Sequence, residues 1–222
     1  MNADDAKSRA GRVWFGYGRW DAPYWFVGME PGGKDENASY ESWLRLGGSE
    51  LLDCKAHHLD CEFTRWHIGP RPPTQSTWRR LIQALLAFKG EPTDLDAVRV
   101  YQRDRWGMSN DETASIELVA LHAPSLSHAS DRTAHREERV STIQKRLFDN
   151  KPTFAIFYGG YRDEYERIVG DRFDADGFAM CGPTVCALTP HPTAWLNRGG
   201  WTEDRWINIG KELRRKADGS SL

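Results

Sequence analysis

Short apolar runs alternate along the chain with longer amphipathic segments. Four runs have the length of buried strands and end in glycine, proline or polar residues, at 24–27, 116–121, 153–158 and 184–188. Five segments carry apolar residues at helical intervals, at 37–46, 74–88, 133–148, 161–169 and 203–216. Strands separated by helices predict an α/β fold, in which a four-stranded parallel sheet has helices on both faces as a three-layer α/β/α sandwich.

The same pattern predicts one domain over residues 1–222. We find no internal repeat and no linker between the predicted elements. The last helix is followed by a short Gly-Ser-Ser end, so we expect a mobile C-terminal tail at 217–222.

Two loops that follow the first and fourth predicted strands contain the most distinctive residues. The first loop consists of Gly28, Met29, Glu30, Pro31, Gly32 and Gly33. The second contains His191, Pro192, Thr193, Ala194, Trp195, Leu196, Asn197 and Arg198. Loops that follow parallel strands meet at the carboxyl edge of a sheet. We therefore expect Glu30 and His191 to face one crevice, although they are far apart in sequence.

These loops resemble two motifs of the uracil-DNA glycosylase superfamily. Its first motif is Gly-x-(Asp/Asn/Glu)-Pro-(Tyr/Gly), and its second is His-Pro-Ser followed by a DNA-inserting loop. The likeness is greatest to the single-strand-selective uracil glycosylases, which have Gly-Met-Asn-Pro-Gly first and His-Pro-Ser-Pro-Arg-Asn, then Lys-Gly-Trp, second. Here Glu30 stands where those enzymes have Asn, and Thr193 stands where they have Ser.

The resemblance implies hydrolysis of an N-glycosidic bond in base excision repair. The base is flipped out of the DNA stack, and water attacks the sugar while negative charge develops on the departing base. Glu30 is expected to orient or deprotonate that water. His191 is expected to donate a hydrogen bond to the base oxygen that becomes anionic.

Other residues of the two loops are implied to bind the substrate. The backbone amides of Gly32 and Gly33 have room to approach a phosphate because no side chain obstructs them. The second loop would supply a wedge from Trp195 or Leu196 and flanking phosphate contacts from Asn197 and Arg198. The remaining substrate-binding residues of the two motifs are Gly28, Met29, Pro31, Pro192 and Thr193.

Two further segments resemble the superfamily less closely. Trp66 is the candidate platform under a flipped base, and it is equally well explained as a core anchor. At the end of the second predicted strand, Leu121 takes the position of an Asn that contacts the edge of uracil. Leu lacks that amide, so the sequence does not define the base. His122 and Ser125 are the neighbouring polar candidates.

Charge and composition modify this picture only slightly. A net charge of −2 is unlike that of general nucleic-acid binders, which have a basic excess. Arg65, Arg71, Arg79 and Arg80 gather around one predicted loop and helix start, and a second basic run follows the second motif at 211–216. For the second run we favour a solvated helix face balanced by nearby carboxylates.

Cysteine and histidine residues raise the question of a metal. Cys54, His57, His58 and Cys61 place four potential ligands within eight residues. Their spacing matches neither the usual zinc pairs nor the iron–sulfur pattern of some glycosylases. We therefore favour reduced cysteines with no metal and no cofactor, with a metal-dependent hydrolase centred on these residues as an alternative.

The compartment and partners follow from the same reasoning. No apolar stretch approaches the roughly 20 residues that span a bilayer, and the first residues lack a signal-peptide pattern. We expect a cytoplasmic protein whose partner is DNA, single-stranded DNA included, and no membrane partner. The alternative within the same fold is a noncatalytic protein that binds nucleic acid or a nucleotide. Strand preference and oligomeric state are not defined by the sequence.

Overall fold

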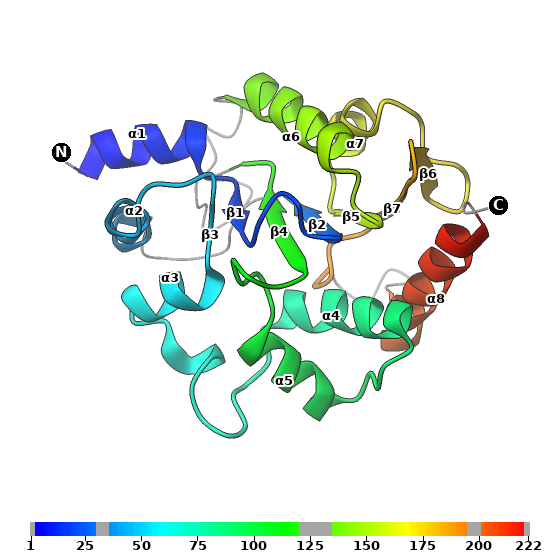
Figure 1. Cartoon of the computed structure of the whole chain (residues 1–222), viewed down its shortest axis with the longest axis horizontal. Helices are drawn as coiled ribbons and strands as arrows, with labels where there is room; N and C mark the ends of the chain where they lie inside the picture. The colour runs from blue at the N-terminus through cyan, green and yellow to red at the C-terminus, as the bar shows by residue number, and fades with distance from the viewer. Residues whose placement is uncertain (1–2, 30–35, 120–134, 195–200, 220–222) are drawn as a thin grey trace.

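The computed structural model describes residues 3–29, 36–119, 135–194 and 201–219. Among these residues, seven strands form one mixed sheet in the order β3-β1-β4-β2-β5-β7-β6 (Figure 1). The strands are β1 (Gly16–Tyr17), β2 (Tyr24–Gly28), β3 (Leu51–Leu52), β4 (Thr113–Glu117), β5 (Phe154–Tyr158), β6 (Phe178–Cys181) and β7 (Thr184–Thr189). The central strands β4, β2, β5 and β7 are parallel, whereas β1 runs antiparallel to β4 and β6 antiparallel to β7.

The four strands expected from the sequence are the four central ones, but the expected four-stranded, all-parallel sheet is wrong. The additional strands β1, β3 and β6 are two, two and four residues long, which is too short for hydrophobic periodicity to reveal. The strand expected at 116–121 also begins earlier, at Thr113. Thr113 and Ser115 are buried although they are polar, so the apolar pattern did not include them.

Eight helices and one short 3-10 helix are present in the described residues. They are α1 (Ala3–Val13), α2 (Glu36–Arg45), α3 (Cys54–Asp60), η1 (Thr64–Trp66), α4 (Ser76–Lys89), α5 (Leu95–Asp104), α6 (Arg136–Asn150), α7 (Arg162–Val169) and α8 (Glu203–Gly219). The five expected helices correspond to α2, α4, α6, α7 and α8. Residues 217–219 belong to α8, and 220–222 lie outside the described residues, so the expected mobility of 217–222 stays a prediction.

Helices cover both faces of the sheet, so the expected α/β class is confirmed. One face carries Phe26, Phe154 and Ile156 and packs against α4, α5 and α8. The opposite face carries Trp25 and Phe157 and packs against α6 and α7. Figure 1 shows α6 and α7 on one side of the strands and α4 and α5 on the other. Alternate residues of each central strand therefore supply the two cores.

The close contact between α4 and α8 depends on a glycine. A Cβ added to Gly210 would lie 2.0 Å from the backbone oxygen of Ala84. No side chain fits in that space, so the two helix backbones approach each other only because residue 210 is glycine. α4 itself is capped after Lys89 by Gly90, whose φ of 73° is in the left-handed region that favours glycine.

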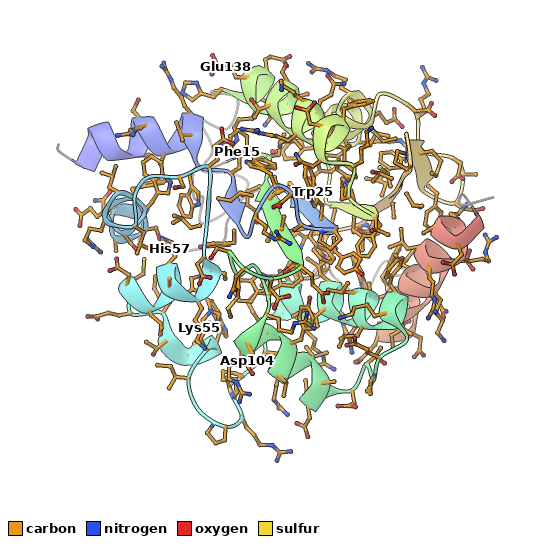
Figure 2. All side chains as sticks on the ribbon, viewed as in Figure 1. Phe15, Trp25, Lys55, His57, Asp104 and Glu138 are labelled. Atoms are coloured by element: carbon orange, nitrogen blue, oxygen red, sulfur yellow. The ribbon has the colours of Figure 1, made fainter. Side chains whose placement is uncertain are left out.

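A buried arginine connects the N-terminal segment to β4. Arg139 of α6 donates hydrogen bonds to the backbone oxygens of Gly11, Trp14, Glu117 and Leu118. Its guanidinium also lies over the ring of Phe15, which Figure 2 shows beside β1. Burial lowers the pKa of Arg139 to about 9, so the group is still charged at neutral pH. These contacts fix the end of β4, which contributes to the candidate site.

Candidate functional site

The four parallel strands end at one edge of the sheet. Gly28 at the end of β2 pairs in register with Glu117 at the end of β4, and Tyr158 of β5 pairs with Thr189 of β7. In the sheet, β4 lies on one side of β2, and β5 and then β7 lie on the other side. The chain therefore adds strands in one direction from β2 to β4 and in the opposite direction from β5 to β7, so the winding reverses between β2 and β5. Ligands of open α/β sheets bind at such a reversal. The structure therefore places the starts of both motif loops, after Gly28 and after Thr189, at this edge.

Gly28 is surrounded so closely that a side chain there would force its neighbours to shift. The hydroxyl oxygen of Tyr158 and Oε2 of Glu117 lie 2.3 and 2.7 Å from the point where its Cβ would be. Tyr158 is buried, and burial, with a smaller contribution from the charge of Glu117, raises the pKa of its phenol. A protonated phenol and a carboxyl group thus lie above the end of β2.

Met29 connects the first motif to the end of β5. The backbone N–H of Gly160 donates to Sδ of Met29 at 3.2 Å, and Gly159 donates to the backbone oxygen of Thr189 at 3.0 Å. Gly159 has a φ of +108°, and a Cβ there would lie 2.3 Å from the Met29 sulfur. These contacts hold the starts of the loops after β2, β5 and β7 against one another.

His191 of the second motif lies beside Tyr158, with ring centroids 5.7 Å apart and an edge-to-face orientation. Nδ1 of His191 is 3.2 Å from the backbone nitrogen and 2.9 Å from Oγ1 of Thr193. A backbone N–H can only donate, so Nδ1 accepts and we assign the ring proton to Nε2. Burial lowers the pKa of His191, so the ring is neutral at pH 7. Pro192 lies between the two residues that form this turn.

Many residues expected in the site lie outside the described residues. They are Glu30, Pro31, Gly32 and Gly33 of the first loop, Leu121 and His122 after β4, and Trp195, Leu196, Asn197 and Arg198 of the second loop. Their expected roles stay predictions.

Trp66 lies in η1, within an aromatic group that surrounds α3. Its ring is 5.5 Å from the rings of both His58 and Trp78, and the guanidinium of Arg65 lies 4.5 Å from its centroid. Trp78 itself is buried in the core. The role of Trp66 as a base platform stays a prediction.

Three of the four arginines that the sequence gathers around one loop and helix start, Arg71, Arg79 and Arg80, are paired with carboxylates. Arg79 and Arg80 lie 2.9 and 3.0 Å from Oε2 of Glu203 at the start of α8, and Arg71 lies 2.9 Å from Asp96. On the C-terminal basic run, Arg215 pairs with Glu212, as we expected for a balanced helix face. The charges of these arginines are thus partly neutralised within the protein.

Two residues of the sheet edge were not identified from the sequence. Tyr158 was assigned only to the interior of an apolar run. Glu117 was hidden inside the strand expected at 116–121, where a single carboxylate between apolar residues was a signal that the strand ends there.

The four metal-ligand candidates of α3 do not form one group. Cys54 and His58 are four residues apart and lie on one face of the helix, where Nδ1 of His58 is 2.9 Å from Nε2 of His67. His57 and Cys61 lie on another face, with Nε2 and Sγ 3.5 Å apart. The sequence analysis missed His67, which comes from beyond η1.

Comparison with known proteins does not assign a family to the chain. No protein-family model matches the sequence, and no curated protein matches it. Among the described helices, none has the length and apolar character needed to cross a membrane.

Proposed function

We propose that this protein hydrolyses the N-glycosidic bond of uracil or another damaged base in DNA, in a reaction of base excision repair. The observation that carries the proposal is the hydrogen bonding of His191. Its Nδ1 accepts from Thr193, which leaves a proton on Nε2 of a neutral ring at the carboxyl edge of the sheet. A neutral imidazole in this tautomer is a hydrogen-bond donor for an oxygen that gains negative charge.

The proposed chemistry requires a donor for the leaving base and a group that activates water. His191 is the donor, and its N–H becomes a stronger partner as the base departs because the acceptor becomes anionic. Glu30 is the proposed group that orients or deprotonates water. The Thr193 hydroxyl, 2.9 Å from Nδ1 of His191, helps to hold the ring in this orientation.

Glu117 provides a second carboxyl group at the same edge. Its Oε2 and the Tyr158 hydroxyl both approach Gly28, from the strands on either side of β2. A phenol and a carboxyl group supply both a donor and acceptors, which is what recognition of a polar base edge requires. This arrangement supports a polar ligand at the reversal point, whichever base is bound.

Arg79 and Arg80 are paired with Glu203, so the proposal does not use them for phosphate binding. We propose that Arg198 and Asn197 contact flanking phosphates, with Trp195 or Leu196 as the wedge. The amides of Gly32 and Gly33 would bind the phosphate of the flipped nucleotide. A few local contacts of this kind do not require a basic overall charge.

We place the reaction in the cytoplasm. The cysteines at 54, 61, 181 and 186 are all free and buried. Free thiols are typical of proteins in a reducing compartment.

The experiment that tests the proposal uses oligonucleotides that each contain one uracil, hypoxanthine or xanthine, in single and double strands. Cleavage to an abasic site is detected as a strand break after alkaline treatment. Glu30→Gln should lower the rate by about two to four orders of magnitude, because the carboxylate that activates water is lost. Glu138→Gln is the matched control, because Glu138 is an exposed residue of α6, and it should leave the rate unchanged.

Two results would contradict the proposal. Wild-type protein that leaves every substrate intact would favour the noncatalytic reading, in which the same edge only binds nucleic acid or a nucleotide. Equal rates in wild type and Glu30→Gln would exclude Glu30 from the reaction.

A further inference from the structure

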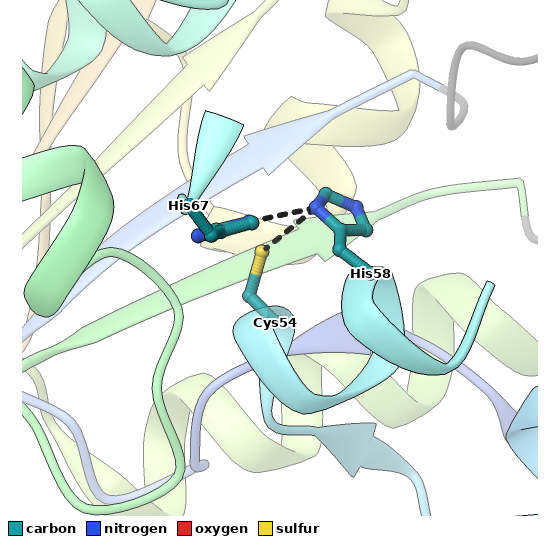
Figure 3. Close-up of side chains that lie close together, drawn as sticks. All are labelled: Cys54, His58 and His67. Carbon is teal, nitrogen blue, oxygen red and sulfur yellow. Dashed lines mark hydrogen bonds between the residues drawn. The ribbon is translucent and has the colours of Figure 1, made fainter. Parts of the chain in front are cut away.

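Three potential metal ligands converge between α3 and the residue that follows η1. Nδ1 of His58 lies 3.9 Å from Sγ of Cys54 and 2.9 Å from Nε2 of His67 (Figure 3). The three ligand atoms all lie within 4.8 Å of one another. We call these residues the Cys54 cluster; their exposed fractions are 0%, 6% and 3% for Cys54, His58 and His67. All three side chains are therefore shielded from solvent.

Hydrogen bonds on the other side of His58 define which of its nitrogens carries the proton. Nε2 of His57 lies 3.1 Å from the backbone oxygen of Ser39, which can only accept, so we assign the His57 proton to Nε2. Nδ1 of His57 therefore accepts the hydroxyl proton of Tyr17, 2.9 Å away. The Tyr17 oxygen in turn accepts from Nε2 of His58 at 3.4 Å. This sequence of bonds places a lone pair, not a proton, on Nδ1 of His58.

That lone pair faces His67. Neither neutral tautomer of His67 satisfies the hydrogen bonding of both of its ring nitrogens and of Nδ1 of His58. If His67 carries its proton on Nε2, it donates to His58, but its buried Nδ1 then has no hydrogen-bond partner among the described residues. If it carries the proton on Nδ1, towards the backbone of Arg103, two lone pairs face each other at 2.9 Å. A metal cation between the rings resolves this conflict.

We propose that Cys54, His58 and His67 bind one zinc ion. Zinc prefers thiolate and imidazole ligands, at about 2.3 Å to sulfur and about 2.0–2.1 Å to nitrogen. Those bond lengths imply tetrahedral ligand separations of about 3.3 Å between nitrogens and about 3.6 Å between nitrogen and sulfur. The observed separations of 2.9 and 3.9 Å need only small shifts of the side chains.

The surroundings support a cation at this position. On binding, the Cys54 thiol loses one proton to solvent and becomes the thiolate that bonds to the metal. One thiolate and two neutral imidazoles leave a charge of +1, and the carboxylate of Asp53 acts electrostatically on both Cys54 and His67. Tyr17 accepts from the second nitrogen of His58, as outer partners of metal-binding histidines do. The three residues leave a fourth position for a water molecule.

The proposal predicts that the full-length protein binds zinc in a defined ratio. Protein treated with a chelator and then titrated with zinc chloride should take up about one zinc per chain, measured by elemental analysis after removal of free metal. Cys54→Ser and His67→Gln should each lower the zinc affinity at least about tenfold, because each removes a ligand. Neither residue belongs to the proposed glycosylase site, so this result is independent of DNA cleavage.

Cys61→Ser is the matched control, because Cys61 is the other cysteine of this region and its sulfur lies beside His57 instead. It should bind zinc as the wild type does. If Cys54→Ser does not fold, cobalt chloride added to chelator-treated wild-type protein provides the second measurement: a thiolate-to-cobalt charge-transfer absorption supports the proposal. Wild-type protein that takes up neither metal would overturn it, and so would zinc that is lost in Cys61→Ser but kept in Cys54→Ser.

Discussion

The sheet edge and the Cys54 cluster both present histidine, but they do so in different ways. At the edge, His191 is only partly buried, and its tautomer is defined by a residue two positions along the chain. In the cluster, His58 and His67 are buried, and their tautomers depend on Tyr17, His57 and Ser39 through a chain of hydrogen bonds. A local turn is thus sufficient to prepare a donor for a ligand, whereas a buried group of histidines depends on several elements at once.

This difference implies that the two regions are sensitive to different properties. Changes at the edge should affect chemistry with little effect on folding, because few contacts depend on the altered side chains. Changes in the cluster should affect stability and metal content, because the cluster joins α3 to the residue after η1 and contacts β1 through Tyr17. The three predictions below test this separation, from the largest expected effect to the smallest.

Replacing His191 at the sheet edge and His67 in the Cys54 cluster by alanine, each in its own variant, should distinguish the two regions most clearly. His191→Ala should lower the rate of base release by about 10²- to 10³-fold through loss of a donor, and should change the free energy of unfolding by less than about 1 kcal/mol. His67→Ala should lower the free energy of unfolding by about 2–4 kcal/mol and leave the rate unchanged at a temperature where it is folded. Rates and urea unfolding of both variants measure the two effects. A stable His191→Ala protein with full activity would show that His191 does not take part in the reaction.

Acid should destabilise the protein partly through His191. Burial lowers its folded-state pKa below the ordinary 6.5, so its contribution to stability is complete above pH 6.5 and is lost as the pH falls through the lowered pKa. His191→Gln should reduce the slope of unfolding free energy against pH below 6.5, by at most about 1.4 kcal/mol per pH unit. Urea unfolding at a series of pH values measures that slope. Identical slopes in wild type and variant would show that the folded-state pKa of His191 is not lowered.

Adding a methyl group at the end of β2 should have the smallest effect of the three. Gly28→Ala places Cβ against the Tyr158 hydroxyl and the Glu117 carboxyl group, and because both neighbours are side chains that can shift, we expect a loss of only about 1 kcal/mol in unfolding free energy. Gly160→Ala is the control, because its Cβ would meet nothing within 4 Å. Thermal unfolding compares the two variants. Equal stabilities would show that Tyr158 and Glu117 move aside without cost.

The sequence predicted the centre of the sheet because each central strand carries its own local signal. The apolar runs that became β2, β5 and β7 were located within a residue or two, and the order of motifs placed Gly28 and His191 at one edge. The short strands β1 and β3 were missed because each has only two residues, which contain no hydrophobic period. The predicted position of β4 was displaced because Thr113 and Ser115, which share one face of the sheet, are polar residues that are nevertheless buried.

The residues that form the Cys54 cluster could not be predicted from sequence spacing, for a different reason. The spacing of Cys54, His57, His58 and Cys61 is visible in the sequence, but the helical arrangement of α3 divides them into two pairs. His67 and Tyr17 join only through tertiary packing. A periodicity argument applied to α3 would have separated the pairs, but nothing local indicated the partners from other elements.

The four backbone oxygens that accept hydrogen bonds from Arg139 affect local unfolding of the N-terminal segment, which contains Gly11 and Trp14. Two of them belong to the N-terminal segment and two to the end of β4, so one charged group from α6 joins three parts of the chain. Releasing the N-terminal segment alone would leave two guanidinium hydrogen bonds broken around a buried charge. That segment should therefore not fray as an independent unit. Its amide protons should exchange with solvent only in the same rare openings that expose the central strands.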